Sequence, residues 1–313
     1  MDARDDKRLW RYIKTVGRPQ NNESSRNRAP CTSSSAIIIT MSPAKRKARH
    51  RDRTMKTSII TLTTDFGTRD GYVGQMKGVI FSINPSCMVV DITHDIAPFA
   101  IREAALVVKG ISSYFPPGVI HLSVVDPGVG GARRPIAVKT EKSLFVGPDN
   151  GLFSYILTSS APWQAREITN EALLMPDPHP TFHGRDIFAP VSAFLSAGAE
   201  FESIGPILDD PIVLPCPSPQ ETSSGVLGEV IYIDRFGNAT TNIESGMLGH
   251  AVGEVQVGHT RILGLSRCFA DARVGMPLAL INSFGFLEIA INGGCAAEEL
   301  DIKVGDYVNV SWT

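Results

Sequence analysis

Residues 58–83 read SIITLTTDFGTRDGYVGQMKGVIFSI, and this stretch decides the fold class. Its first part is a β-branched run that ends at Asp65-Phe66-Gly67. Its second part places apolar residues at helical spacing over 72–83, and Asn84-Pro85 then stops the helix. A strand that leads through a short polar loop into an amphipathic helix is the first half of a β–α–β unit. The stretch therefore predicts an α/β domain.

The same alternation of strands and helices continues further along the chain. We expect strands over 88–92, 119–125, 136–139 and 144–146, and helices over 101–114 and 186–197. This order predicts a mostly parallel sheet sandwiched by helices, in a domain over 58–210. Functional groups in such sheets gather beyond the carboxyl ends of the strands. Asp65 and Asp126 each follow a strand pattern, and we expect both at that edge.

The pattern changes after a linker over 211–224, which is rich in Pro and Ser. Beyond the linker, short apolar runs alternate with glycine turns, and no long helix intervenes. This predicts a smaller, all-β barrel as a second domain over 225–313. The expected barrel strands cover 226–233, 239–243, 251–257, 261–263, 278–281, 286–291 and 307–310.

The first 57 residues differ in composition from the rest of the chain. They carry 15 Lys and Arg against 5 Asp and Glu, and they are rich in Arg, Asn and Ser. We interpret residues 1–57 as a disordered basic extension. A second interpretation is a mis-assigned start, because Met55 directly precedes the first strand pattern. The segment has no apolar run of the length that a secretory signal needs.

Composition excludes several classes of protein. Residues 58–313 hold 15 basic against 27 acidic residues, which argues against a nucleic-acid partner and does not oppose a cationic substrate. No apolar run approaches the roughly 18 residues of a transmembrane helix. Five cysteines, an odd number without CxxC pairing, predict neither a disulfide framework nor a zinc site. We therefore expect a cytoplasmic protein with no membrane, nucleic-acid or metal partner.

Four loops combine charged or amide side chains with glycine, which lets the backbone approach a ligand closely. These loops begin at Thr64, Asp126, Thr181 and Asp234. The glycine loop at 128–131 lacks both the Lys-Ser/Thr of a phosphate-binding loop and the dinucleotide-binding spacing. It is therefore not expected to bind a nucleotide phosphate.

Taken singly, the residues of these loops also have structural interpretations. Strand-end aspartates commonly cap turns, and His183 suits a hydrogen-bonded core histidine. Arg185 and Asp186 are expected to form local ion pairs or to cap the following helix, and they are left out of the catalytic set. His94 and His121 are interpreted as buried structural imidazoles.

The combination of loops is more specific than any one of them. In this order they resemble the S-adenosyl-L-methionine hydrolase (adenosine-forming) family, also called the SAM hydroxide adenosyltransferases, which are related to the bacterial fluorinase and chlorinase. The resemblance covers 58–313. It rests on TTDFG (63–67), VDITH (90–94), VDPGVG (125–130), PDNG (148–151), TFHGRD (181–186), IDRFGN (233–238) and a tail containing Asn282-Ser283 and Glu288.

The resemblance implies a catalytic trio of Asp126, Arg133 and His183. Asp126 follows the strand before Pro-Gly-Val-Gly, and the family's arginine lies seven residues later, which matches Arg133 and not Arg134. His183 precedes Gly-Arg-Asp. The implied reaction is hydrolysis of S-adenosyl-L-methionine to adenosine and L-methionine, by in-line attack of an activated water on C5′. Whether Asp126 or His183 accepts the proton of the water is left open.

The resemblance also implies a set of substrate contacts. The implied ribose contact is Asp65, with help from Asp70, Gly71 and Tyr72. The expected barrel contacts are Asp234 for the methionine amino group, Asn238 for adenine, Phe236 for stacking, and Ser283 with the Phe284 backbone for the methionine carboxylate. The implied assembly is a homotrimer whose site lies between one subunit's α/β domain and the next subunit's barrel. No cofactor is expected, since S-adenosyl-L-methionine is the substrate.

Two alternatives stay open. A halogenase of the same fold would carry other residues, such as tyrosine, where this chain has Asp126 and His183, and a carboxylate would repel the halide. A non-catalytic S-adenosyl-L-methionine or adenosine-binding protein would use the same binding residues. Product analysis separates these readings, because only the hydrolase releases adenosine and methionine.

Overall fold

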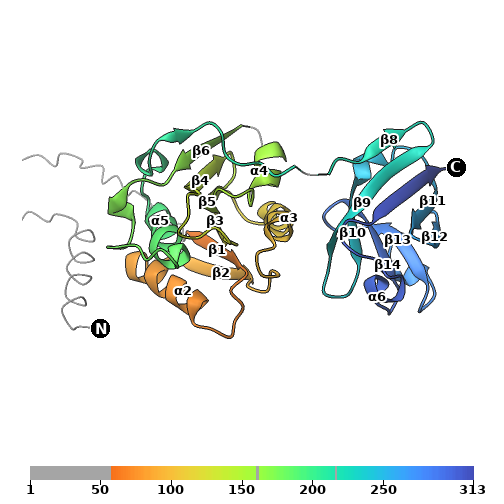
Figure 1. Cartoon of the computed structure of the whole chain (residues 1–313), viewed down its shortest axis with the longest axis horizontal. Coiled ribbons are helices and arrows are strands. Elements are labelled where there is room, and N and C mark those ends of the chain that lie inside the picture. The colour runs from red at the N-terminus through yellow and green to blue at the C-terminus, as the bar shows by residue number, and fades with distance from the viewer. Residues whose placement is uncertain (1–57, 160–161, 216) are drawn as a thin grey trace, which may run out of the picture.

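The computed structural model describes residues 58–159, 162–215 and 217–313. The expected basic extension, together with Cys31 and Cys216, lies outside the described residues. A seven-stranded sheet forms the first half of the described chain (Figure 1). In sheet order its strands are β2 (Met88–Thr93), β1 (Ile59–Thr64), β3 (Ile120–Val124), β5 (Leu144–Pro148), β4 (Pro135–Thr140), β6 (Trp163–Glu167) and β7 (Ile207–Leu208).

The fold class predicted from the sequence is confirmed, with one refinement to the sheet. Strands β2, β1, β3 and β5 are parallel, whereas β4, β6 and β7 continue the sheet in antiparallel pairs. The antiparallel part arises because β4 and β5 are joined by a short turn, which leaves no room for a crossover helix.

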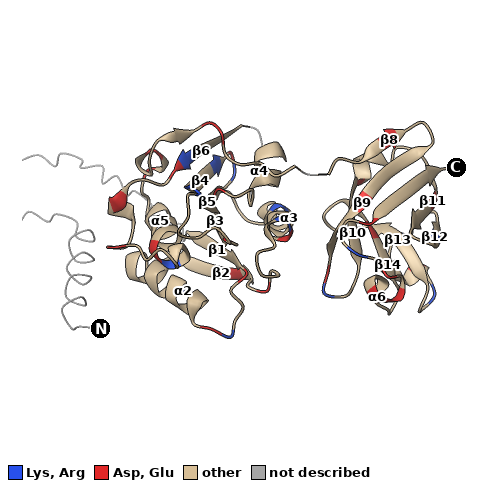
Figure 2. Ribbon diagram, viewed as in Figure 1, with Lys and Arg blue, Asp and Glu red and all other residues tan. Residues whose placement is uncertain are grey.

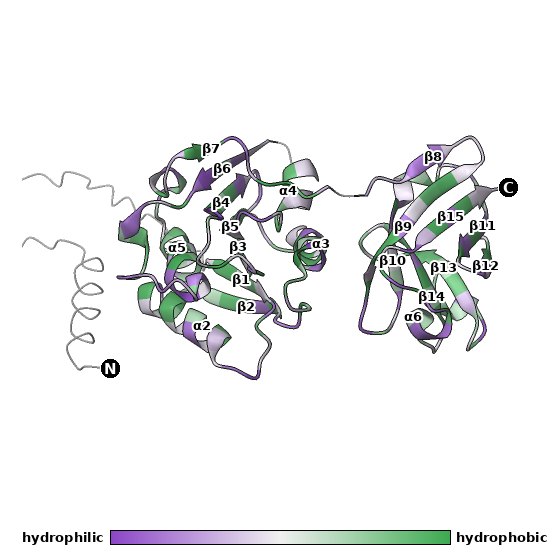
Figure 3. Ribbon diagram, viewed as in Figure 1, coloured by the Kyte–Doolittle hydropathy of each residue, from purple (hydrophilic) through white to green (hydrophobic). Residues whose placement is uncertain are grey.

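Helices cover both faces of the sheet. On one face α2 (Tyr72–Ile83) and α5 (Ala189–Ser196) pack on β1 and β3, and on the other α3 (Ile101–Ser112) and α4 (Ser154–Ser159) cover a second core. The apolar strand residues lie between these layers (Figure 3). Short 3₁₀ turns occur at Glu171–Leu173, Phe201–Ser203, Ser245–Met247 and Phe269–Asp271.

Strand β1 shows how the sequence selects these layers. Ile60 and Leu62 are fully buried toward α2 and α5, whereas Thr61 points to the opposite face, as the two-residue period of a strand requires. There Thr61 Oγ1 lies 2.8 Å from Nδ1 of His121, which is stacked on Phe145. Burial lowers the pKa of His121 to about 4. His121 is therefore the neutral structural imidazole that the sequence analysis expected.

The strand order places a crevice at the end of β1. The chain passes from β1 to β2 on one side and then returns to β3 on the other, so the direction of winding changes between β1 and β3. Such a switch point leaves an opening beyond the carboxyl ends of the two strands. Asp65 directly follows β1, and Asp126 follows β3 by two residues.

The helix expected over 186–197 begins differently from the prediction. A π-helical turn over Gly184–Phe188 precedes α5. Pro190 has no N–H to donate to the carbonyl of Asp186, and this oxygen instead accepts a hydrogen bond from the backbone N–H of Met175 at 2.9 Å. The wide first turn therefore follows from Pro190, and it starts directly after His183.

An eight-stranded antiparallel sheet forms the second half. Its path is β12 (Thr260–Leu263), β11 (Val252–Val257), β15 (Tyr307–Trp312), β9 (Gly225–Ile233), β10 (Ala239–Glu244), β14 (Phe286–Ile291) and β13 (Pro277–Ile281), with β8 (Gln220–Thr222) paired to β9. Ser266 bridges to Leu280, so the sheet is nearly closed around a core of its own. One short helix, α6 (Ala296–Glu299), follows β14.

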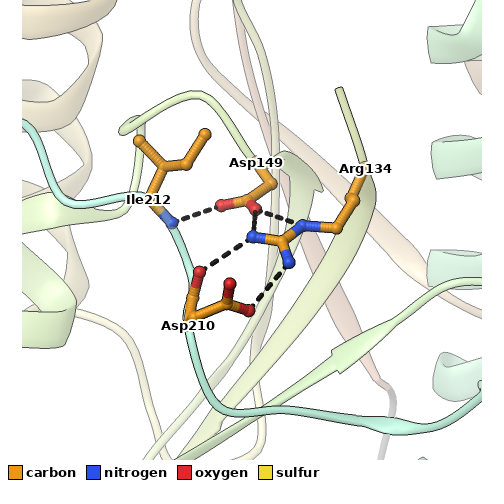
Figure 4. A network of polar contacts seen from close by, with 4 residues as sticks. All are labelled: Arg134, Asp149, Asp210 and Ile212. Atoms are coloured by element: carbon orange, nitrogen blue, oxygen red, sulfur yellow. Dashed lines mark hydrogen bonds and ion pairs between the residues drawn. The ribbon is translucent and has the colours of Figure 1, made fainter. Parts of the chain in front are cut away.

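A polar network fixes the segment that leaves the α/β sheet toward the barrel (Figure 4). Asp149, whose side chain is only 1% exposed, accepts hydrogen bonds from Arg134 Nε at 2.9 Å and from the backbone N–H of Ile212 at 2.7 Å. Arg134 also donates to the side chain and carbonyl of Asp210, at 2.8 Å each. Charged side chains are scattered elsewhere on both halves (Figure 2). We call Arg134, Asp149, Asp210 and Ile212 the linker clamp.

Helix α3 faces the barrel of its own chain. Lys109 lies 3.3 Å from Glu244, and Tyr114 Oη donates to the carbonyl of Ser283 at 3.3 Å. The ring of Phe284 packs against Gly110, where a Cβ atom would collide with it. The barrel therefore contacts the sheet domain on the α3 side, away from α2 and α5 (Figure 1).

Candidate active site

A pocket of about 600 Å³ opens beyond the carboxyl ends of β1 and β3. It lies at the winding switch, where open α/β sheets commonly bind their ligands. The pocket is lined by Phe66, Tyr72, Gln75, Val124, Asp126, Val129, His179, Thr181, Phe182, His183 and Arg185. All of these residues belong to the α/β part of the chain.

Asp126, which lines this pocket, forms a buried ion pair with Arg133, which does not line it. Arg133 Nε donates to both carboxylate oxygens of Asp126 at 3.0 Å, and Nη2 donates to Oδ2 as well. The side chains are 4% and 9% exposed, respectively. The loop turns back through Gly130, whose φ is +75° and where a Cβ atom would collide with the carbonyl of Pro180. This glycine therefore brings the loop of Asp126 against the loop that carries His183.

His183 joins the pair through the same arginine. Its Nδ1 lies 2.7 Å from Arg133 Nη2, so Nδ1 accepts and the neutral ring carries its proton on Nε2. Burial lowers the pKa of His183, and the neighbouring Arg133 lowers it further, against opposing effects of Asp126 and Asp186. A carboxylate, a guanidinium and a neutral imidazole thus meet at one point, as the sequence-based hypothesis requires.

Three aromatic rings form one wall of the pocket. The ring centroids of Phe66, Tyr72 and Phe182 lie 5.3–5.9 Å apart in edge-to-face contacts. Sequence reasoning placed Tyr72 in the site but did not single out Phe66 or Phe182 as lining residues. Phe66 follows Asp65 in the TTDFG motif, and Phe182 precedes His183 in the TFHGRD motif. This position next to an expected site residue is the only signal in the sequence that marks the two phenylalanines.

Arg185 forms the local ion pair that the sequence analysis expected. Its Nε lies 2.6 Å from Asp186 Oδ1, and its Nη1 donates to Gln75 on α2 at 3.0 Å. Asp186 also accepts from the backbone N–H of His179 at 2.9 Å. These contacts hold the loop of His183 against α2. Arg185 in addition lines the pocket, which sequence reasoning did not anticipate.

The other expected ribose contacts lie beside the pocket. Asp65 is half-buried, and its Oδ2 accepts from the backbone N–H of Phe99 at 3.0 Å, where Phe99 adopts a φ of +69°. Asp70 and Gly71 are exposed in the turn that enters α2, and neither lines the pocket. Asp65 therefore holds a strained backbone position in this structure.

The expected barrel contacts do not line this pocket. Asp234 Oδ1 accepts from the backbone N–H groups of Phe236 and Asn238 at 2.9 Å, and its Oδ2 accepts from Asn238 Nδ2 at 3.0 Å. This loop presents Phe236 with 74% of its surface exposed. Ser283 and Phe284 lie against α3. One chain thus carries two separate groups of expected site residues.

Other reactive side chains of the described residues lie outside the pocket. His94 is buried, and its Nδ1 lies 2.8 Å from Thr64 Oγ1. Cys87, Cys268 and Cys295 are free thiols, and burial raises the pKa of Cys87. Within the described ranges, no group of three or more His, Cys, Asp or Glu side chains is arranged to hold a metal ion. Nor does any described helix have the length and apolarity to cross a membrane.

Comparison with known proteins places this chain in a defined family. Residues 60–205 match the SAM hydroxide adenosyltransferase N-terminal domain, and residues 228–309 match the C-terminal domain of the same family. The chain belongs to the SAM hydroxide adenosyltransferase family.

Individual relatives carry more specific names. The chain is 38% identical over 255 residues to the (R)-S-adenosyl-L-methionine hydrolase of Salinispora arenicola, covering 80% of this chain and 97% of that protein. It is 38% identical over 256 residues to the enzyme of the same name from Thermus thermophilus, covering 77% and 95%. A fluorinase of an Actinoplanes species is 31% identical over 289 residues, covering 81% and 97%.

Solved structures show the same fold. An uncharacterized conserved protein from Thermotoga maritima is 39% identical, with a TM-score of 0.76, covering 80% of this chain and 99% of that chain. A conserved hypothetical protein from Thermus thermophilus is 36% identical, with a TM-score of 0.68, covering 81% and 100%.

Proposed function

We propose that this chain hydrolyses S-adenosyl-L-methionine to adenosine and L-methionine. The observation that carries the proposal is the contact of Arg133 with both Asp126 and His183, which line the pocket. The names of the (R)-S-adenosyl-L-methionine hydrolases, at 38% identity, support it. We propose that residues 58–210 carry the chemistry and residues 225–313 complete substrate recognition.

The proposed reaction needs a nucleophile more than it needs a general acid. The oxygen of a water molecule forms a bond to C5′ of the ribose while the C5′–S bond breaks and its electron pair stays on sulfur. The sulfonium thereby becomes a neutral thioether, so no proton has to be supplied to the leaving group. The attacking water loses one proton. Because the sulfonium already activates C5′, we propose that no cofactor takes part.

We propose that Asp126 accepts this proton. His183 Nδ1 already accepts a hydrogen bond from Arg133, so Nε2 carries the ring proton and can only donate to a water. Asp126 is bound to Arg133, yet its Oδ1 accepts only one of these hydrogen bonds and keeps a second lone pair. In this scheme His183 orients the water, Arg133 stabilises the developing negative charge on its oxygen, and Asp126 removes the proton.

The substrate epimer is also part of the proposal. The relatives at 36–38% identity are named for the (R) configuration, and we propose that the same configuration at sulfur is preferred by this chain. The wall of Phe66, Tyr72 and Phe182 offers aromatic surface against which a sulfonium or an adenosyl group can pack. Supplying the two epimers separately tests this preference.

We further propose a homotrimer in which the barrel of a second subunit closes the pocket. The Asp234 and Phe236 loop does not line the pocket of its own chain, and Phe236 is largely exposed. In a symmetric ring of three subunits the same contact repeats at each interface, so each pocket receives one such loop from a neighbouring subunit.

We also place the enzyme in the cytoplasm. The free thiols Cys87, Cys268 and Cys295 suit the reducing conditions of that compartment.

Turnover in ¹⁸O-labelled water tests the proposed function. The label is expected in the 5′-hydroxyl of adenosine, with one adenosine and one methionine formed per S-adenosyl-L-methionine consumed. Label-free adenosine would contradict attack by water on C5′. Binding without product would favour the non-catalytic alternative, and a 5′-halo-adenosine formed only with added fluoride or chloride would favour the halogenase.

The pH dependence follows from the lowered pKa of His183. The network needs the neutral ring, and because its pKa is depressed, the ring stays neutral below the ordinary value of 6.5. We expect kcat/KM to stay constant as the pH falls through 6.5, and to decline only at lower pH. A pH–rate profile of the wild type measures this. An acid limb centred above pH 6.5 would contradict the assignment of a neutral His183.

A further inference from the structure

Asp186 is a buried carboxylate that the proposed mechanism does not use. It lies three residues after His183, in the π-helical turn that precedes α5, and its side chain is only 5% exposed. A carboxylate that is removed from water destabilises the fold unless charged or polar groups compensate it. The contacts of Asp186 therefore indicate what this buried charge does for the chain.

The side chain of Asp186 closes the loop that carries His183. Its Oδ2 accepts a hydrogen bond from the backbone N–H of His179 at 2.9 Å, seven residues earlier. Inside this loop, the N–H of Phe182 donates to the carbonyl of His179 at 3.1 Å, and the N–H of Asp186 donates to the carbonyl of Phe182 at 3.2 Å. The carboxylate thus ties the end of the loop to its beginning, with His183 between them.

The same carboxylate connects the loop to α2 through Arg185. Arg185 Nε lies 2.6 Å from Oδ1 of Asp186, and Arg185 Nη2 lies 2.7 Å from Oδ2, so the ion pair is bidentate. The remaining nitrogen, Nη1, donates to Gln75 on α2 at 3.0 Å. Because a bidentate pair fixes the plane of the guanidinium, Asp186 determines how Arg185 reaches the helix.

The main chain of Asp186 is held by a separate contact. Pro190 has no N–H to donate to the Asp186 carbonyl, and in a regular helix its ring would crowd that oxygen. The N–H of Met175 donates to this carbonyl instead, at 2.9 Å. Asp186 is therefore fixed through both its side chain and its main chain, and the loop of His183 ends at this fixed point.

We propose that Asp186 is a positioning residue, whose carboxylate holds the loop over 179–186 so that Nδ1 of His183 meets Arg133. This inference rests on the proposed function. His183 Nδ1 lies 2.7 Å from Arg133 Nη2, and a hydrogen bond of this length is lost when the ring moves away by about 1 Å. Asp186 does not line the pocket, so it acts on the reaction through His183 and not on the substrate.

A double-variant cycle on kcat tests this proposal. Asparagine keeps the shape of the side chain and an oxygen that can accept from His179, but it loses the charge that pairs with Arg185. Asp186→Asn alone is expected to lower kcat about 10- to 100-fold, with KM changed only a few-fold, because a misplacement of about 1 Å has an effect of this size. In the His183→Ala background the same substitution is expected to change kcat by less than about twofold, because the loop then has no imidazole to position.

Single-turnover assays with radiolabelled S-adenosyl-L-methionine follow the wild type, both single variants and the double variant. Asp271→Asn is the matched control, because Asp271 also closes a loop, by accepting from the backbone N–H of Arg267 at 2.8 Å, but lies in the barrel. This control is expected to keep the wild-type rate. If Asp186→Asn lowered the rate by the same factor in both backgrounds, Asp186 would support the fold alone and the proposal would be overturned, as it would be by a wild-type rate.

Pro190→Ala provides a second variant if Asp186→Asn does not fold. Alanine supplies an N–H that can reach the Asp186 carbonyl along the helix, so the wide turn can tighten while the side chains of the loop stay unchanged. We expect the rate to fall about 10-fold when His183 is present and to stay constant in the His183→Ala background. A wild-type rate, or an equal loss in both backgrounds, would contradict the positioning role. Wild-type protein that releases no adenosine would instead remove the proposed function itself.

Discussion

Asp126→Asn is expected to lower kcat for adenosine release by about 10³-fold, with KM changed only a few-fold. Asparagine has nearly the same shape but cannot accept the proton of the attacking water, and its amide group would face Arg133. The loss should therefore fall on the chemical step. Steady-state kinetics of adenosine formation, followed by chromatography, measure both constants.

The control for this variant must separate chemistry from stability. Asp126 is buried against Arg133, so removing its charge also leaves a guanidinium without its partner. Asp95→Asn changes an exposed carboxylate just beyond β2, at the same edge of the sheet, and is expected to keep wild-type kinetics. If Asp126→Asn stayed folded at the assay temperature and kept a wild-type kcat, Asp126 would not be the proton acceptor.

Two inactive variants are expected to restore activity when they assemble together. Asp126→Asn disables the α/β side of a site, and Phe236→Asp places a charge on the exposed barrel ring, lowering kcat/KM by about 100-fold if this ring stacks on adenine. In a mixed trimer, one site of the three combines an intact α/β domain with an intact barrel. Doubly tagged assemblies should therefore regain about one third of wild-type activity.

Co-expression with two different affinity tags provides these mixed assemblies. Two differently tagged copies of Asp126→Asn, purified in the same way, form the control and are expected to stay inactive. Mixed assemblies no more active than their parents would show that each site is built from one chain only. A single-chain mass in light scattering would contradict the trimer directly.

The fold could be predicted largely because its layers follow from local patterns. The helix expected over 72–83 coincides with α2, since its apolar spacing and the Asn84-Pro85 stop are both local signals. Strands β6, β7 and β8 were not expected, because they are short, polar or at an edge. The π-helical turn before α5 was not expected either, because the sequence shows Pro190 but not that Met175 satisfies the Asp186 carbonyl, which Pro190 leaves without a helical donor.

The site could be predicted only in part. The residues Asp126, Arg133 and His183 were named from a family resemblance, and their contacts depend on packing between segments about 50 residues apart. Residue type alone cannot distinguish Arg133 from Arg134, because the two side chains are chemically identical. Only the family's seven-residue spacing from Asp126 selects Arg133. Glu288 is marked in the sequence only as part of a motif, since neither its burial nor its contacts with Thr240 and Asn282 are visible there.

Arg133 and Arg134 are consecutive residues directly before β4, and they take part in two different sets of contacts. Arg133 turns toward Asp126 and His183, whereas Arg134 holds the linker clamp with Asp149 and Asp210. The linker to the barrel is thus held by the residue next to Arg133, whose guanidinium group contacts Asp126 and His183. A displacement of the linker at Asp210 would therefore act directly on the neighbour of the catalytic-site arginine, so the position of the linker and the geometry around Arg133 are coupled.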